Sequence, residues 1–311
     1  RSAGIAADGE QFGGGRHNTL PRCLRLLLTE RGTVCPWGLA RYWFRCHSNE
    51  YYDIQLGWGV QMSSIIMASV PVHGHVTPLL SLAENLVRRG DDVRFITGSR
   101  FEDRVRATGA SFVPLTGAAD YDDRTLLDSF PERAKLKGAK AIAFDIDRVF
   151  ARPAKAQYET IMTAIATQPA DAVLTDPTFA GGAFMLEHPR SARPALIMCG
   201  VLPLGIGSRD TAPFGMGLRP ARVFNRRRNA ALAALNRRVL RQPFQTANAL
   251  HREVHGADIP FPLTDWSRHA EAIIQFSVAS FEYPLTDAPA HLHFAGPLSA
   301  RGSQAPRPEW W

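Results

Sequence analysis

The chain has 311 residues, an apolar content of 45% and a formal net charge of +7. This composition is typical of a folded globular protein. The basic balance modestly favours anionic partners such as nucleic acid, anionic lipid or phosphate-bearing ligands, and an arginine-rich composition without such a partner is the equal alternative. No apolar run approaches the roughly 18 residues of a membrane-spanning helix. Three of the four cysteines fall within the first 50 residues and none forms a Cys-x-x-Cys pair. We therefore expect neither a disulfide framework nor a zinc finger, and a cytoplasmic location.

The N-terminal segment differs from the rest of the chain. Residues 1–61 carry a triple glycine and aromatic residues that follow no helix or strand period. Met62 then opens an apolar strand. We expect residues 1–61 to be a poorly ordered extension outside the fold, although a small N-terminal module remains an alternative. The Pro-rich residues 299–311 are predicted to be the start of a linker.

Strand and helix patterns alternate from Met62 onward. The predicted strands cover residues 64–70, 92–97, 111–115, 172–175, 195–199, 272–276 and 291–294. The predicted helices cover residues 78–89, 100–108, 139–168 with an interruption at Pro153, 180–186 and 223–254. This order predicts an α/β domain over residues 62–298, with a Rossmann-like parallel sheet and helices on both faces.

Two histidines follow the first predicted strand. Thr77 is a suitable N-cap and Pro78 suits the first helical position, so His73 and His75 are predicted in the loop between strand and helix. Such loops lie at the carboxyl end of a parallel sheet, where open α/β folds bind ligands. The sequence therefore predicts a functional site around these two side chains.

Several motifs occur in the order found in one enzyme family. The matching segments are Val72–Pro78, Leu86–Gly90, Asp92–Thr97, Arg106–Ala110, Asp171–Asp176 and Phe294–Leu298. With them, residues 62–300 resemble the acceptor-binding N-terminal domain of GT-B glycosyltransferases. The nearest group is the bacterial macrolide and rhamnosyl transferases, which are related to the UDP-sugar transferases.

The resemblance implies an inverting glycosyltransferase, with the chain forming the N-terminal half of a GT-B fold. Such an enzyme moves a sugar from a UDP- or dTDP-sugar to a hydroxyl of a lipophilic small molecule. His75 is implied to be the general base and Asp176 to support it. The structural alternative for His75 is a loop histidine that only hydrogen-bonds the backbone. The structural alternative for Asp176 is a helix N-cap.

The resemblance also implies ligand contacts around this pair. Gly74 and Thr77 would face the donor. The implied acceptor contacts are His73, Val76, Phe179 and Phe214. For His73, a structural hydrogen bond within the loop is the alternative.

The family's donor-binding half has no counterpart in this sequence. No glycine-rich His-Gly-Gly or His-Cys-Gly signature is found before Trp311. The alternatives are therefore a truncated acceptor-binding module without turnover, or one subunit of a split transferase completed by a separate donor-domain chain. Asp145 and Asp147 lie in a helical pattern rather than in a metal-binding loop, so neither a metal nor another cofactor is expected.

A basic run predicts a further surface. One predicted helix carries the arginines Arg226–Arg228, Arg237, Arg238 and Arg241. Such a basic helix suits peripheral contact with an anionic membrane. A basic membrane-surface binding protein is thus a third alternative, and a solvated helix face is the structural one. No nucleic-acid-binding module is recognised, and we expect no such partner.

Overall fold

Seven strands form one parallel sheet in the order β3-β2-β1-β4-β5-β6-β7. The computed structural model describes residues 62–125, 130–221 and 223–298, so the predictions for residues 1–61 and 299–311 lie outside the described residues. The strands are β1 Ser64–Ala68, β2 Asp92–Thr97, β3 Ser111–Pro114, β4 Ala172–Thr175, β5 Ala195–Gly200, β6 Ala272–Gln275 and β7 Leu292–Phe294. Strands β4, β5 and β6 are buried along their whole length, as expected for strands covered on both faces.

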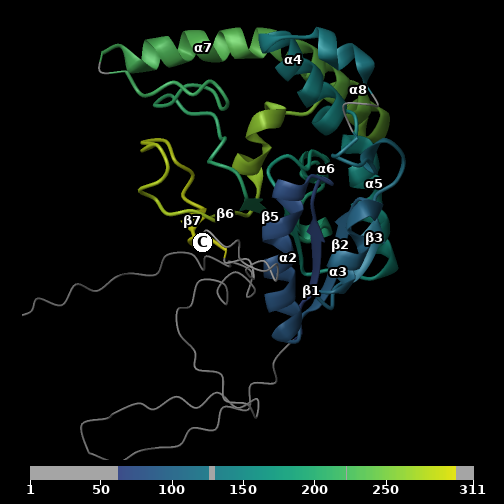
Figure 1. The fold of residues 1–311 in the computed structure, drawn as a ribbon. Coiled ribbons are helices and arrows are strands. Elements are labelled where there is room, and N and C mark those ends of the chain that lie inside the picture. Colours follow the sequence, from purple (N-terminus) through teal and green to yellow (C-terminus); the bar gives the residue numbers. More distant parts are fainter. Residues whose placement is uncertain (1–61, 126–129, 222, 299–311) are drawn as a thin grey trace, which may run out of the picture. The chain divides into compact units, whose positions relative to one another are not determined.

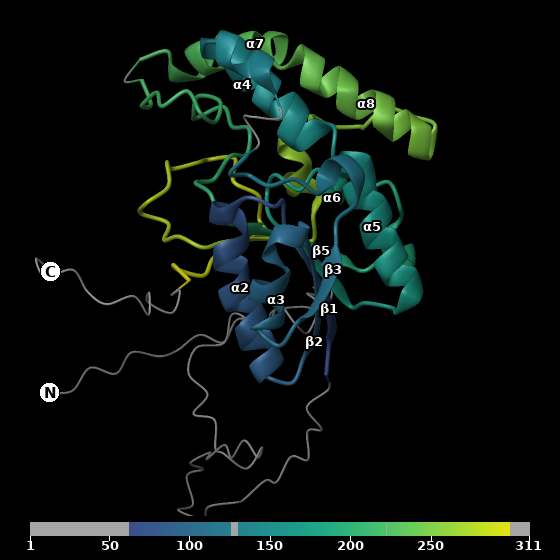
Figure 2. The same cartoon turned by 45° about the vertical axis from the view of Figure 1, so that its right-hand side comes forward.

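Helices cover both faces of this sheet, which confirms the predicted Rossmann-like fold. The helices are α2 His73–Arg88, α3 Glu102–Arg106, α4 Gly138–Asp145, α5 Ala154–Thr167, α6 Gly181–Met185, α7 Asn225–Val239 and α8 Arg241–His255. Helices α2 and α3 lie on one face of the sheet and α5 lies on the other (Figures 1 and 2). Helices α4, α7 and α8 contact one another and form a layer beyond the carboxyl ends of the strands.

The predicted start of the first helix is wrong. Helix α2 begins at His73 and contains Pro78, which was expected at the first helical position. The N–H groups of His75 and Val76 donate to the Val72 carbonyl at 2.9 and 3.0 Å and close the first turn. The Asp123 carboxylate, 50 residues away, accepts the His73 N–H at 2.9 Å. Because this long-range contact caps the helix, local capping signals at Thr77 do not set its start.

The long predicted helices are interrupted. As expected, Pro153 precedes a new helix, α5, and the turn before it, Ile146–Ala151, is π-helical. The prediction of one helix over residues 223–254 is wrong, because the chain breaks at the buried Leu240 between α7 and α8. Pro243 in the first turn of α8 explains the break, since proline has no N–H to continue the hydrogen bonding of α7.

Helix α6 packs against α5 at a glycine that has no room for a side chain. A Cβ on Gly181 would lie 2.6 Å from both the Gln157 Cβ and the Tyr158 backbone nitrogen. At the next residue, Gly182, the atom nearest to an added Cβ would belong to Trp266, at 3.4 Å. This pair of glycines separates the effect of crowding from the effect of helix propensity.

We expect Gly181→Ala to destabilise the fold by about 1–3 kcal/mol, since backbone atoms of α5 would have to move. Gly182→Ala makes the same chemical change in the same helix without the clash, and its cost should stay below about 1 kcal/mol. Thermal or denaturant unfolding of both variants measures the difference. Equal stability of the two would contradict the close packing of α5 and α6.

Candidate active site

His75 and Asp176 form a buried pair at the carboxyl ends of β1 and β4. The His75 Nδ1 lies 3.1 Å from Asp176 Oδ1, although the two residues are 101 positions apart in the sequence. The Asp176 side chain is fully buried, and 9% of the His75 side chain is exposed. Because β1 and β4 are neighbours in the sheet, their ends bring these two residues together.

Four donors surround the Asp176 carboxylate. Oδ2 accepts the Val70 N–H at 2.8 Å, while Oδ1 accepts the Thr178 N–H at 2.8 Å and the Thr178 hydroxyl at 2.5 Å. His75 supplies the fourth contact. The alternative of a helix N-cap with Pro177 at the first helical position does not hold, because α6 begins only at Gly181. The carboxylate instead fixes the turn that follows β4 and the imidazole together.

The surroundings of His75 set the position of its ring proton. Nδ1 faces the Asp176 carboxylate and, at 3.1 Å, the oxygen of Thr178, whose own hydroxyl donates to Asp176. Both neighbours accept a hydrogen bond, so Nδ1 carries the proton and Nε2 keeps its lone pair. Among the described residues Nε2 has no hydrogen-bond partner, and it is not sealed from solvent. Nε2 is thus the ring nitrogen that is free to accept a hydrogen bond.

The pair is also coupled electrostatically. Burial lowers the pKa of His75. The charge of Asp176 and its hydrogen bond to the ring together raise this pKa by more than burial lowers it, so the pKa of His75 lies above its ordinary value. For Asp176, burial raises the pKa, whereas His75 and the hydrogen bonds from Thr178 and Val70 lower it below its ordinary value. The arrangement therefore favours an ionised carboxylate beside an imidazole of increased basicity.

The pattern of sequence motifs did not indicate Tyr121. Its hydroxyl is buried without a hydrogen-bond partner among the described residues, and burial together with the charge of Asp176 raises its pKa. Tyr121 is an aromatic residue between aspartates, Asp120 and Asp122, in the Asp-rich segment 117–138, and that contrast is the signal that could have found it. The same segment supplies Asp123, which caps α2.

Removing this unpaired hydroxyl is expected to be harmless to the fold. We expect Tyr121→Phe to leave the free energy of unfolding unchanged or to raise it by about 1 kcal/mol, because no hydrogen bond is lost. Thermal unfolding of the variant checks this. A marked loss of stability would instead show that the hydroxyl is satisfied by a group such as bound water.

The first turn of α2 is tied to Arg104, another residue that sequence reasoning missed. Arg104 Nη1 lies 3.2 Å from His73 Nδ1, and Nη2 donates to the Thr77 hydroxyl at 3.1 Å. Open space faces Gly74, since a Cβ there would meet no atom within 4 Å. The residues predicted to face the donor thus lie beside a guanidinium group at a helix N-terminus, a combination that suits an anion.

The residues predicted to contact the acceptor differ in how exposed their side chains are. Val76 and Phe179 are fully buried in the hydrophobic core, so neither side chain is open to a ligand in this conformation. Phe214 is 56% exposed in the segment between β5 and α7. His73 is exposed as well, and it lies in the first turn of α2, where its ring contacts Arg104.

The described residues offer neither a metal site nor a membrane span. Within them, no cluster of three or more His, Cys, Asp or Glu side chains has the arrangement to hold a metal ion. None of the helices in this part of the chain is long and apolar enough to span a membrane.

Part of the chain is similar to a known glycosyltransferase domain. Residues 65–187 match the model of the glycosyltransferase family 28 N-terminal domain. The matched residues span strands β1 to β4 and end just after helix α6. Both His75 and Asp176 fall inside the matched range.

Curated relatives extend the similarity beyond residues 65–187. 4'-Demethylrebeccamycin synthase of Lentzea aerocolonigenes is 31% identical over 255 residues, which cover 79% of this chain and 59% of the relative. UDP-glucosyltransferase A1 of Starmerella bombicola is 31% identical over 262 residues, which cover 79% of this chain and 54% of the relative. The chain thus spans a little over half the length of these relatives.

A solved structure supports the fold. The structure of the glycotransferase of kitacinnamycin superimposes with a TM-score of 0.53 at 19% identity, covering 80% of this chain and 56% of that one. At this identity the likeness concerns the fold alone. It agrees with the predicted N-terminal half of a GT-B fold.

Proposed function

We propose that the chain forms the acceptor-binding half of a glycosyltransferase that moves a sugar from a nucleotide-diphosphate sugar to a hydroxyl of a lipophilic small molecule. The observation that carries the proposal is the buried contact between His75 Nδ1 and Asp176 Oδ1, which leaves Nε2 accessible. The match of residues 65–187 to the family 28 model and the relatives named as UDP-glucosyltransferases support the same class of reaction.

The chemistry follows from this tautomer. Nε2 of His75 removes the proton from the acceptor hydroxyl while the oxygen attacks the anomeric carbon of the donor sugar. The bond between that carbon and the diphosphate oxygen breaks, and the nucleoside diphosphate leaves with inversion at the anomeric carbon. Asp176 stabilises the imidazolium that forms and holds the ring in place. No step in this scheme requires a metal ion or another cofactor from the chain.

The N-terminus of α2 and Arg104 would lie toward the negative diphosphate, since both favour an anion. The remaining donor contacts would come from a region like the 41% of the demethylrebeccamycin synthase that the alignment, with its 59% coverage, leaves out. A separate donor-domain chain would supply the same contacts in a split enzyme.

The direct test incubates the full chain with UDP- or dTDP-sugars and a panel of hydroxylated aromatic and macrocyclic acceptors. Mass spectrometry would then detect the acceptor with one added sugar residue, and His75→Ala should form this product at least about 10²-fold more slowly. Calorimetry with the same acceptors measures binding separately. Acceptor binding without transfer would identify a binding module, and the absence of both would contradict the proposal.

A further inference from the structure

The net positive charge of this protein arises from a single segment. Between Asp210 and Glu253 the sequence contains nine arginines and no lysine, aspartate or glutamate. This segment contributes more positive charge than the net +7 of the whole chain, so the remaining residues are slightly acidic in sum. The family 28 match, residues 65–187, does not include this segment.

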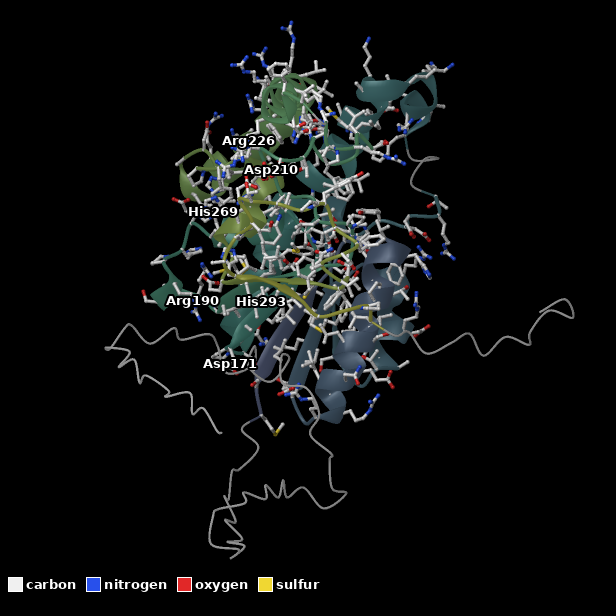
Figure 3. The ribbon with its side chains drawn as sticks, turned by 90° about the vertical axis from the view of Figure 1, so that its left-hand side faces the viewer. Asp171, Arg190, Asp210, Arg226, His269 and His293 are labelled. Carbon is white, nitrogen blue, oxygen red and sulfur yellow. The ribbon has the colours of Figure 1, made fainter. Side chains whose placement is uncertain are left out.

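Most of these arginines have no carboxylate partner. Among the described residues, Arg226 pairs with Asp210 and Arg252 with Asp258, whereas Arg227, Arg237 and Arg238 form no ion pair. All three of the latter are exposed. Nitrogen-tipped side chains project from α7 away from the rest of the fold (Figure 3). Unpaired exposed cations create a field that attracts an anionic surface.

The exposed face of α7 combines charge with small and apolar side chains. Arg227 and Arg238 share one face of the helix with Ala231 and Ala234, because their spacing of three and four residues repeats the helical turn. All four are exposed. Leu235, which is 53% exposed, lies at the edge of this face. Small side chains between arginines let the helix approach a flat surface closely.

Two large apolar residues lead into this face. Val223 and Phe224 are each 72% exposed, and the guanidinium of Arg227 lies 5.7 Å from the centroid of the Phe224 ring. Phe224 holds φ at 53°, in the left-handed region that residues without glycine's freedom rarely adopt. An exposed aromatic ring beside arginine is suited to the boundary between lipid headgroups and acyl chains.

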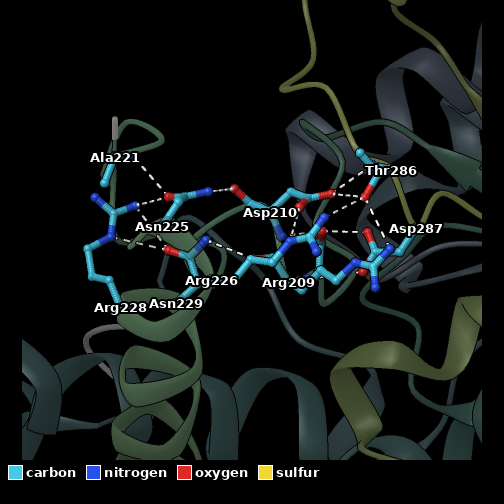
Figure 4. Close-up of polar contacts among 10 residues, drawn as sticks. Arg209, Asp210, Ala221, Asn225, Arg226, Arg228, Asn229, Thr286 and Asp287 are labelled. Atoms are coloured by element: carbon cyan, nitrogen blue, oxygen red, sulfur yellow. Dashed lines mark hydrogen bonds and ion pairs between the residues drawn. The ribbon is translucent and has the colours of Figure 1, made fainter. Parts of the chain in front are cut away.

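The fold fixes α7 at the end where this residue lies. Asp210 accepts hydrogen bonds from the Thr286 N–H at 2.7 Å and from the Thr286 hydroxyl at 2.6 Å, and it pairs with Arg226 at 3.3 Å. Asn225 Nδ2 donates to the Asp210 carbonyl at 2.6 Å, and Asn229 Nδ2 donates to the Arg209 carbonyl at 3.1 Å. This network joins the start of α7 to the segment between β6 and β7 (Figure 4). The basic face is therefore presented on an anchored helix.

Neighbouring residues add to the same charge. Helix α4 contacts α7, and it carries the exposed Lys140, with the exposed Lys137 directly before it. We propose that α7 and the residues leading into it bind peripherally to an anionic lipid membrane. The exposed valine, phenylalanine and leucine favour lipid over nucleic acid, whose backbone offers phosphates but no apolar layer.

The test is sedimentation of the full chain with vesicles of phosphatidylcholine alone or mixed equally with phosphatidylglycerol. We expect binding to the anionic vesicles only, with loss of binding when the ionic strength rises to about 1 M. Arg227→Gln/Arg237→Gln/Arg238→Gln should weaken it by about 10-fold or more, given the contribution of each arginine near an anionic surface. The control Arg88→Gln/Arg89→Gln/Arg106→Gln removes the same charge from the C-terminal ends of α2 and α3, including the residue directly after α2, and should change binding less than about twofold.

A second variant keeps the charge. Phe224→Asn suits the left-handed backbone, so the fold should be retained while the ring is lost, and binding should fall several-fold. Equal weakening by the two arginine triplets would overturn the proposal, because binding would then follow net charge alone. Absence of binding to anionic vesicles would overturn the proposal as well. Binding to duplex DNA without binding to the vesicles, at the same salt concentration, is one form of that outcome.

Discussion

Replacing His75 with alanine is expected to lower the rate of glycosyl transfer by about 10²–10⁴-fold, the usual contribution of a general base. The variant loses the one group whose Nε2 is free to accept the hydroxyl proton while its Nδ1 is held 3.1 Å from Asp176. Acceptor and donor affinity should change little, so the loss should appear in kcat rather than in KM. Initial rates over a range of acceptor and donor concentrations measure both quantities.

His73 provides the matched control for this prediction. It lies in the same turn of α2, two residues before His75, but it is exposed and its Nδ1 contacts Arg104 at 3.2 Å. His73→Ala should therefore lower the rate by less than about 10-fold, because it removes a positioning contact and no proton acceptor. A larger loss for His73 than for His75 would transfer the role of base to the exposed histidine.

The strands of the fold were predictable from the sequence because burial on both faces leaves little freedom in composition. The runs at Asp92–Thr97 and Ala172–Thr175 form strands within the predicted bounds. Helix ends were less predictable. The start of α2 depends on a long-range contact with Asp123, which no local sequence pattern indicates. The break after α7 depends on Pro243, a local signal that the sequence does contain.

The candidate site was predictable only in part. Family motifs indicated His75 and Asp176, and the sheet order explains why residues 101 positions apart meet. Thr178 and Arg104 carry no motif, since their roles arise from the turn after β4 and from the packing of α3 beside α2. Val76 and Phe179 show the opposite case, because apolar residues near a motif can equally well belong to the core.

Asp176→Asn is expected to lower the transfer rate by about 10²-fold or more and to shift its pH dependence. Transfer needs neutral His75, so in the parent chain the rate rises as the pH increases through the raised pKa of this residue. The asparagine removes the charge and the hydrogen bond that raise this pKa, whereas burial, which lowers it, remains. The acidic limb of the pH profile should therefore move to lower pH while the maximum rate falls.

The same variant should lose stability within a defined pH window. The folded state lowers the pKa of Asp176, so this contribution is present above the ordinary aspartate pKa of about 3.9 and is lost as the pH falls through the lowered value. The folded state also raises the pKa of His75. The stabilising contribution of His75 is therefore complete below about pH 6.5 and is lost as the pH rises through the raised pKa. The pair thus stabilises the fold most between about pH 4 and pH 6.5.

Asparagine cannot reproduce the hydrogen bonds of this carboxylate, because its amide group offers a donor where Asp176 accepts from Val70 or from Thr178. We expect Asp176→Asn to cost about 1–3 kcal/mol of unfolding free energy, with the largest difference inside that window. Denaturant unfolding across the pH range and kcat/KM profiles of both proteins measure the two effects independently. An acidic limb that stays in place would show that Asp176 does not set the basicity of His75, even if the stability loss is observed.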